Sequence, residues 1–506
     1  MVPDTLYTSR VATLALSVVL ASLGACRLLV DDAESTRLRS LLRQSVAAVT
    51  ELSAARTDGP RTQTHAAPAI PEILRAITAR DIAALERLLG GLPAAHEDGK
   101  LALDALWRVF RLFDIVIPGA LPTLDVWVTE QPQSHAARVA RGRQYAALGW
   151  QARGTKYAHE TSSSQFREMA RLHILAVEDL RVSLRSTRTP FLAIETLMGI
   201  AQGAGDEQMV AVLFEEGIRA MPRNFPLYRA RMMSLEPRWG GSLAAMTDLV
   251  ARAENDILSP GEIAWLRTWV FLEEHDAEIR SNPRAAVSYA VKATEMDNRA
   301  PRWRHRSAVE RDHGFLEEAL ASASRAIALD PEDYEGWADR ARLHEKRGAM
   351  ADARADYERG ARLGSHYAQE RVIRALVYGE LAMKRDYAAA REWCEFAAAM
   401  ANPWGDFCIG GLYFDGLGGL PKDATQGFDR FLRAAEQGHA TAQHDVGWML
   451  VQGRGVAQNR DQGIEWLRKA ARQNHEYAKA KLQQLGVPID PAPSLQAWLR
   501  EVFTRR

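Results

Sequence analysis

The sequence contains few of the residues that build small secreted scaffolds or metal sites. Only three cysteines occur in 506 residues. That number excludes a fold held together by several disulfides and a zinc site with four cysteine ligands. The formal net charge is zero, because 64 lysines and arginines balance 64 aspartates and glutamates. The whole-chain charge therefore attracts neither nucleic acid nor an anionic bilayer, and no nucleic-acid partner is predicted.

Catalytic motifs are missing as well. The chain has no HExxH metalloprotease motif, no GxSxG nucleophile elbow and no phosphate-binding loop with its lysine. Its carboxylates lie mostly in arginine-rich helical patterns, where a cation three or four residues away is their usual partner. The sequence thus predicts no enzyme, no catalytic residue, no cofactor and no metal. The alternative is an active site assembled from residues that are distant in the sequence.

Long apolar runs are absent except for one near the N-terminus, from Val11 to Cys26. A membrane-spanning helix needs about 20 apolar residues, so this run is too short to span. Arg10 precedes it, and small residues stand just ahead of Cys26, as in a cleaved secretory signal. We therefore expect residues 1–25 to be a signal peptide that is removed.

The end of this run carries a more specific motif. Leu23-Gly24-Ala25-Cys26 resembles the lipobox of bacterial lipoproteins. The resemblance implies a lipid on the Cys26 sulfur, which anchors a protein to a membrane without spanning it. It also implies a location in the cell envelope, with Arg27 favouring the outer membrane facing the periplasm. An ordinary export signal that contains a cysteine is the alternative.

Residues 26–68 would then form the lipid anchor, one helix and a linker. Apolar residues at helical spacing predict an amphipathic helix within 32–56. The stretch TDGPRTQTHAAP, residues 57–68, breaks this pattern with glycine, proline and small polar residues. We expect it to be a tether that lets the body stand away from the membrane.

From 69 to 260 the chain is rich in leucine, alanine and arginine, and prolines punctuate it, so we expect a run of helices that includes 73–89 and 136–152. Part of it, about residues 70–255, resembles the uncharacterised bacterial domain of unknown function 4034. The resemblance rests on Trp127, Pro132, Ser134, Ala137, Trp150, Arg153-Gly154 and Pro237-Arg238-Trp239-Gly240-Gly241-Ser242. That family implies a helical array but no activity.

The turn at 237–242 allows two interpretations. In the structural one, Pro237 ends a helix, the two glycines make a tight connection and Ser242 caps the next helix. In the other, a ligand pocket collects polar groups around Arg153, Arg238 and Trp239. The second interpretation would make the protein an envelope enzyme or small-ligand-binding protein, with its repeats as accessories.

An internal period of 34 residues follows within 261–365. It relates Trp303 to Trp337, Gly314 to Gly348, Ala319 to Ala353 and Leu329 to Leu363. This period resembles the tetratricopeptide repeat. Glycine would form the turn inside each helical hairpin, and alanine would let the two helices approach closely.

A second array covers 366–487 with a period of 36 to 37 residues. Its copies at 410–443 and 446–479 share the pairs Gly416/Gly453, Gly418/Gly455, Gly427/Gly463 and His439/His475. They resemble Sel-one-like repeats, and the segment around Trp393 resembles a degenerate third copy without the glycine loop. We expect the glycines to shape loops rather than bind phosphate, and the two histidines to end helices rather than bind metal.

Cys394 and Cys408 flank the connection at Asn402-Pro403. On antiparallel neighbouring helices their sulfurs could form a disulfide that closes a short loop. Two separately buried thiols are the alternative, and the sequence leaves the choice open.

Stacked helical hairpins present an extended concave surface, so we expect the function to be binding of a protein or peptide. Resemblance to tetratricopeptide proteins places groove-facing positions at Arg304, Arg311, Arg342, Glu345 and Lys346. Four of them are basic, which favours an acidic peptide or a free C-terminal carboxylate. The asparagines of the carboxylate-clamp pattern are absent, however, and a solvated charged face is the alternative.

Together these features predict an all-α protein: a right-handed helical-repeat solenoid, or α/α superhelix, preceded by a helical N-terminal domain. The expected function is that of a lipid-anchored cell-envelope scaffold, which meets the membrane through its anchor only. Residues 488–506 are expected to form a C-terminal tail with a closing helix near 495–503 that caps the array.

Overall fold

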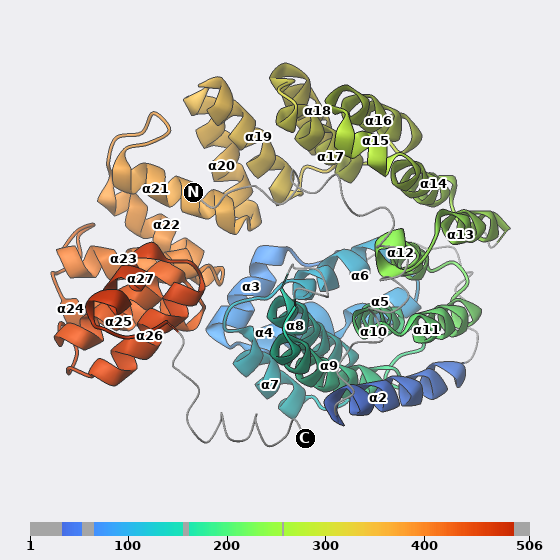
Figure 1. The fold of residues 1–506 in the computed structure, drawn as a ribbon, viewed down its shortest axis with the longest axis horizontal. Coiled ribbons are helices and arrows are strands. Elements are labelled where there is room, and N and C mark those ends of the chain that lie inside the picture. Colours follow the sequence, from blue (N-terminus) through green and yellow to red (C-terminus); the bar gives the residue numbers. More distant parts are fainter. Residues whose placement is uncertain (1–32, 53–64, 155–160, 256–257, 490–506) are drawn as a thin grey trace. The chain divides into compact units, whose positions relative to one another are not determined.

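The structure is a computed structural model that describes residues 33–52, 65–154, 161–255 and 258–489. Every regular element in these residues is a helix (Figure 1). The all-α fold with a helical-repeat solenoid is therefore confirmed. The signal segment, Cys26 and the closing helix near 495–503 lie outside the described residues. Among the described helices, none has both the length and the apolar character needed to cross a membrane.

The chain divides into two compact units, each of which is discontinuous in sequence. The first unit comprises Met1–Pro68, Ile82–Ile117 and Leu124–Asn298. The second comprises Ala69–Asp81, Pro118–Thr123 and Arg299–Arg506. The predicted domain boundaries, among them 260/261, stay a prediction.

The helices up to residue 298, apart from α3, fall wholly or partly within the first unit. They are α2 (Ala33–Thr50), α4 (Ile82–Leu85), η2 (Glu86–Gly90), α5 (Leu92–Glu97), α6 (Leu103–Phe110), η3 (Arg111–Asp114), α7 (Ala120–Glu130), α8 (His135–Arg153), α9 (Ser163–Ser183), α10 (Phe191–Gly203), α11 (Glu207–Ala220), α12 (Phe225–Ser234), η5 (Pro237–Trp239), α13 (Leu243–Asn255), α14 (Pro260–Glu274), α15 (Asp276–Ser281) and α16 (Pro283–Met296).

The long helices α8 and α9 pack against each other, and glycines let them approach closely. A Cβ atom on Gly142 would lie 3.0 Å from the Leu180 side chain, and one on Gly149 would lie 2.4 Å from His173. Ala140 and Leu180 are fully buried in this contact. The helix predicted at 136–152 is thus confirmed as α8. The continuous helix predicted at 73–89 is wrong, because Arg80 adopts a left-handed conformation (φ 55°) that ends α3.

Helix α2 packs against α9 and α11 with its apolar side inward. Leu38, Leu42 and Val49 are buried, and Arg219 of α11 donates a 2.8 Å hydrogen bond to the Thr50 carbonyl. After the linker, the His65 N–H donates to the Lys100 carbonyl at 3.2 Å. Both flanks of the linker are therefore attached to the first unit. Most of the predicted tether at 57–68 lies outside the described residues, and its role stays a prediction.

The second unit contains α3 (Ile70–Ala79) and ten helices that pack in consecutive pairs, followed by α27. They are α17 (Ala300–Asp312), α18 (Leu316–Leu329), α19 (Tyr334–Arg347), α20 (Met350–Leu363), α21 (His366–Tyr378), α22 (Tyr387–Ala399), α23 (Pro403–Asp415), α24 (Ala424–Glu436), α25 (Ala440–Gln452), α26 (Arg460–Arg472) and α27 (Glu476–Gln484). The first helix of each pair is called the A helix and the second the B helix.

The first two hairpins, α17–α18 and α19–α20, follow the predicted 34-residue pattern. Gly314 and Gly348 have φ values of 87° and 83° in the turns between A and B helices. Residues other than glycine rarely adopt a positive φ, which explains why glycine recurs in these turns. Ala319 and Ala353 are fully buried at the helix contacts.

The last two hairpins cross at paired glycines. A Cβ on Gly427 would lie 3.1 Å from the Gly410 carbonyl oxygen in α23–α24, and one on Gly447 would lie 2.8 Å from the Gly463 carbonyl oxygen in α25–α26. Backbones can approach this closely only where side chains are missing. The preceding hairpin, α21–α22, has Ile373 one period before Gly410.

Helix α3 belongs to the second unit although it precedes most of the first in sequence. It packs against α20 and α22, with Arg75 lying 5.9 Å from the Phe396 ring centre. The Thr123 hydroxyl donates a 3.0 Å hydrogen bond to the Ile77 carbonyl. Ile73 and Ile77 are buried. The repeats are thus covered by a segment that the sequence placed in the 69–260 domain.

Candidate binding surface

Arg304 on α17 is the first of the predicted groove residues, and it is surrounded by carboxylates. Its guanidinium lies 3.1 Å from Asp333 and 3.3 Å from Asp339, and it also pairs with Glu335. Burial acts to lower the pKa of Arg304, but the three carboxylates outweigh it and raise that pKa. Arg304 is therefore a firmly charged residue whose positive charge is already compensated.

The same pairing continues onto α19. Asp339, which contacts Arg304, also pairs with Arg342 one turn later. The Arg342 guanidinium lies 5.0 Å from the ring centre of Tyr367 on α21. Asp339 thus links two of the predicted groove arginines, and Arg342 links α19 to the next A helix.

A second group of four charged residues lies on α19, on α21 and just after α21. Glu345 pairs with Arg371 and accepts a 2.7 Å hydrogen bond from the Tyr357 hydroxyl. Arg371 also lies 3.0 Å from Glu380, which lies 3.9 Å from Arg374. Burial, helped by Glu345, raises the pKa of Tyr357, so its hydroxyl remains a donor. An aromatic contact joins this group to the first one, because the ring of Tyr367, which Arg342 contacts, lies 6.0 Å from that of Tyr357. We call the two groups together, Arg304, Asp339, Arg342, Glu345, Arg371, Glu380 and Arg374, the charge ladder.

Two exposed tyrosines accompany the charge ladder on α21. The side chains of Tyr367 and Tyr378 are 42% and 56% exposed. The guanidinium of Arg374 lies 6.0 Å from the Tyr378 ring centre. Tyrosine and arginine are the residue types that contribute most to protein interfaces, because they combine a large contact area with a polar group.

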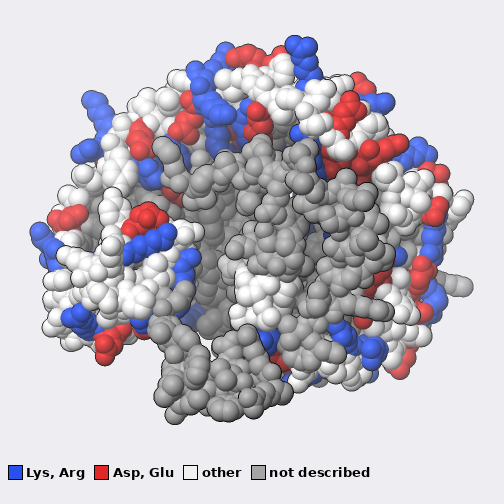
Figure 2. All heavy atoms as spheres, viewed as in Figure 1, with Lys and Arg blue, Asp and Glu red and all other residues white. Residues whose placement is uncertain are grey.

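The other two predicted basic residues lie at the ends of their helices. Arg311 contacts Asp312 at 2.8 Å. Lys346 is exposed near the end of α19. The structure therefore places four predicted cations on the A helices but gives Arg304 and Arg342 carboxylate partners. On the face seen in Figure 2, lysine and arginine likewise alternate with aspartate and glutamate instead of forming a patch of one sign.

Sequence reasoning missed the α21 part of this surface. Arg371, Arg374 and Glu380 lie just beyond the tetratricopeptide period, in the array that resembles a different repeat. The available signal was the hairpin pattern itself, because α21 is the A helix that follows α19 in the stack.

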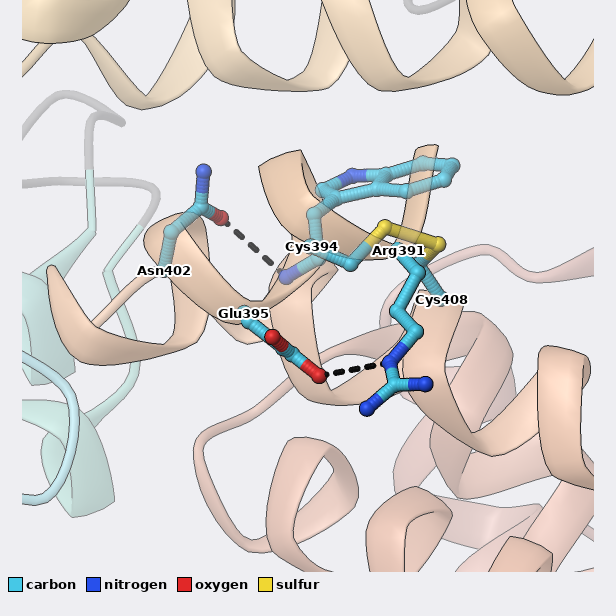
Figure 3. Close-up of a disulfide and its surroundings, with 6 residues drawn as sticks. Arg391, Cys394, Glu395, Asn402 and Cys408 are labelled. Carbon is cyan, nitrogen blue, oxygen red and sulfur yellow. Dashed lines mark hydrogen bonds and ion pairs between the residues drawn. A yellow bond between two sulfur atoms is a disulfide. The ribbon is translucent and has the colours of Figure 1, made fainter. Parts of the chain in front are cut away.

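Cys394 on α22 and Cys408 on α23 form a disulfide, with a sulfur–sulfur distance of 2.11 Å (Figure 3). It joins the B helix of one hairpin to the A helix of the next. Between them, Asn402 accepts a hydrogen bond from the Trp404 N–H at 3.1 Å and donates one to Gln369 at 2.9 Å. Of the two arrangements that the sequence left open, the structure contains the bonded one.

His439 and His475 begin helices instead of ending them, so the expected position was wrong. Nδ1 of His439 accepts the Ala442 N–H at 3.1 Å, and Nδ1 of His475 accepts the Ala478 N–H at 3.3 Å. Each ring therefore caps the N-terminus of its helix, α25 or α27. Burial lowers the pKa of His439 to about 4, which keeps the accepting nitrogen free of a proton. No cluster of possible metal ligands is found among the described residues.

The alternative site around Arg153, Arg238 and Trp239 was the rival prediction. The rings of Trp239 and Trp150 lie 6.1 Å apart, and Arg153 lies 5.8 Å from the Trp150 ring centre. Arg238 instead pairs with Glu236, and its side chain is 63% exposed. Trp150 thus contacts both Arg153 and Trp239, whereas Arg238 is directed to Glu236. Ser242 accepts the Ala245 N–H at 3.2 Å, as the structural interpretation of this turn predicted.

Comparison with known proteins identifies part of the second unit. The Sel1 repeat family matches residues 366–402, 409–439 and 440–475, which confirms three Sel-one-like units. The first match includes the segment interpreted as a degenerate copy. The resemblance of residues 70–255 to the domain of unknown function 4034 stays a prediction, and no curated protein matches the chain.

Several solved structures resemble the chain at low identity. A Sel1 repeat protein from Oxalobacter formigenes is 18% identical, with 55% of this chain and 82% of that protein covered and a TM-score of 0.42. A protective antigen of uropathogenic Escherichia coli with an SLR fold is 18% identical, with 73% and 84% covered and a TM-score of 0.31. YrrB, a TPR protein with an unusual peptide-binding site, is 19% identical, with 38% and 97% covered and a TM-score of 0.25. The family match, and not these likenesses, identifies the repeats at 366–475 as Sel1 repeats.

Proposed function

We propose that this protein is a lipid-anchored scaffold of the cell envelope that binds protein or peptide partners through its helical repeats. The observation that supports binding is the charge ladder with its two exposed tyrosines, which runs across the A helices α17, α19 and α21. Successive A helices of such repeats line one extended surface. A partner that follows this surface would meet alternating charges and aromatic rings.

The partner chemistry follows from how the charges are paired. Arg304 already has three carboxylate partners, and Arg342 and Arg311 are each paired with a carboxylate, so a preference for acidic segments or a C-terminal carboxylate would depend mainly on Lys346. A ladder of alternating signs suits a partner that carries both signs better than a purely acidic one, because each added carboxylate would also approach Glu345 or Asp339.

A photoreactive amino acid at position 367 tests the binding surface. We expect it to crosslink a defined protein in the cell envelope, and we expect the crosslink to weaken in an Arg371→Met variant, which removes a neighbouring ladder charge. The same photoreactive group at Arg354, an exposed residue of helix α20, is the matched control. Equal adducts at 354 and 367, or none at 367, would exclude this surface as the binding site.

The anchor needs a separate test. Mass spectrometry of the N-terminal peptide, after expression in a bacterium with a lipoprotein pathway, should detect a lipid-modified peptide that starts at Cys26. A Cys26→Ala variant should lose the modification. An unmodified N-terminus in the unsubstituted chain would remove the anchor and the envelope location, while leaving the repeat surface to its own test.

A further inference from the structure

The docked position of α2 has a consequence for how the molecule would meet a membrane. Leu42 and Val49 are fully buried against the first unit, and Arg37 forms a 2.7 Å ion pair with Glu178 of α9. Arg219 of α11 holds the last turn of α2 through the Thr50 carbonyl. Contacts along its whole length therefore make α2 part of the first unit.

Only residues 27–32 separate the proposed lipid on Cys26 from the start of α2. Seven Cα-to-Cα steps span at most about 25 Å when fully extended. The linker at 53–64 follows α2 in the sequence, so it does not lengthen the segment between Cys26 and α2.

We propose that α2 acts as a clamp that holds the first unit directly at the membrane surface, with the first turns of α2 facing phospholipid headgroups. The proposal rests on the lipid anchor of the proposed function. In this arrangement the start of α2 can move at most about 25 Å from the anchored Cys26, whereas a flexible tether at 57–68 would allow a larger distance.

The outer side of α2 fits a headgroup surface. Thr36, Ser40 and Arg43 are exposed on it, and Arg37 is exposed too although it pairs with Glu178, whereas the apolar residues of α2 face the protein. A helix that lay within the bilayer interface would need that apolar side for the lipid. The acyl chains would therefore supply the affinity, and α2 would set the distance.

The test attaches the chain to a bilayer independently of natural lipidation. The chain from residue 26, with Cys26→Ser and an N-terminal hexahistidine tag, is bound to phosphatidylcholine vesicles that contain nickel-chelating lipid. A fluorescent donor is placed at position 167 through Arg167→Cys, because Arg167 is an exposed residue of α9, and a headgroup-labelled lipid is the acceptor. The other two cysteines are joined in the disulfide, so the label reacts at position 167.

Two matched insertions of the same 30-residue glycine-serine segment then identify the tether. One is placed between residues 30 and 31, and the other between Asp58 and Gly59. Both positions lie outside the described residues, so neither insertion changes a described helix. We expect the first insertion to reduce energy transfer at least twofold and the second to leave it unchanged.

The opposite result, with transfer reduced only by the insertion at 58/59, would show that the body hangs on the linker and would overturn the clamp. Energy transfer that neither insertion changes would overturn the clamp too. It would mean that the distance between the first unit and the bilayer does not depend on the length of chain between the tag and α2. Because the tag replaces the lipid, these outcomes are independent of whether Cys26 is lipidated in cells.

Discussion

Two histidines lie at the opposite end of a helix from the one that the sequence indicated. The sequence suggested that His439 and His475 end helices, where a protonated ring is favourable. In the structure the neutral ring of His439 accepts an N–H at the start of α25, and the rings of Trp404 and Phe407 lie 5.1 and 4.5 Å from it. Protonation would remove the acceptor and place a positive charge at the positive end of the helix dipole.

Stability should therefore fall in acid through His439. Its folded pKa of about 4 lies below the unfolded value of about 6.5, so its contribution is complete above pH 6.5 and is lost as the pH falls toward 4. We expect the wild-type free energy of unfolding to drop by about 2 kcal/mol more than that of His439→Asn between pH 7 and pH 4. Asparagine keeps the cap without titrating. Urea unfolding at the two pH values measures this, and equal losses in both proteins would contradict the role of His439.

The candidate binding residues could be predicted only in part. Resemblance to the tetratricopeptide repeat located Arg304 and Arg342, because their positions within the period define the face on which they lie. The ion pairs of Arg304 with Asp333 and of Arg371 with Glu345 could not be predicted, since they depend on how neighbouring helices are aligned. A repeat pattern specifies the face of the helix on which a residue lies, but not the residue that it contacts on the neighbouring helix.

At the level of helices, the period of small residues was the reliable signal. Glycine recurs in α23–α24 and α25–α26 because backbones touch there. The first Sel1 unit departs from this pattern. Leu381 stands one period before Gly418 and adopts φ 51°, a conformation that favours glycine, while its side chain is buried. Burial of the leucine side chain offsets the backbone strain. Because leucine stands where the later repeats have glycine, the sequence of this repeat does not show the pattern of the glycine loop.

Adjacent glycines in α23 offer a matched pair of substitutions. A Cβ on Gly410 would lie 2.6 Å from the Phe431 ring, whereas nothing lies within 4 Å of a Cβ on Gly411. We expect Gly410→Ala to lower the free energy of unfolding by about 1–3 kcal/mol through overpacking. Gly411→Ala should raise it by up to about 1 kcal/mol, because alanine favours the helix. Chemical denaturation measures both, and a stabilising Gly410→Ala would show that the two helices can separate without cost.

The disulfide should stabilise the junction between α22 and α23. Cys394 and Cys408 are 14 residues apart, and closing a loop of that size contributes about 3 kcal/mol in the chain-entropy treatment. We expect a reducing agent to lower the urea midpoint of the wild-type protein. A Cys394→Ala/Cys408→Ala variant serves as control and should not respond to the reductant. A wild-type midpoint that is the same with and without reductant would contradict a stabilising bond.

At the level of the whole molecule, the packing of α3 is the feature that sequence patterns could not predict. Amphipathic helices in 69–260 look alike in sequence, and no period connects α3 to α20 and α22, which begin about 270 and 310 residues later. The period-based repeats were recognisable because each contacts its neighbour in sequence. A contact between helices that are far apart in the sequence leaves no periodic pattern.

A fragment of residues 299–506 should therefore be less stable than the same fragment with α3 restored. Ile73, Leu74 and Ile77 are buried side chains of α3, and burial of each contributes about 1.5–3 kcal/mol. We expect fusion of residues 66–84 to the fragment through a glycine-serine linker to raise its melting temperature by several degrees. A fused segment with all three residues changed to serine is the control. Equal melting temperatures for both fusions would mean that α3 does not support the repeats.

The distance between α3 and its partners in the chain also sets an order of events during synthesis. At about 5–20 residues per second, the ribosome finishes α3 roughly 14–54 s before it begins α20. The apolar side of α3 has no final partner in that interval, and a helix of 10 residues is marginal on its own in water. Docking of α3 onto the repeats therefore cannot precede the synthesis of α20 and α22.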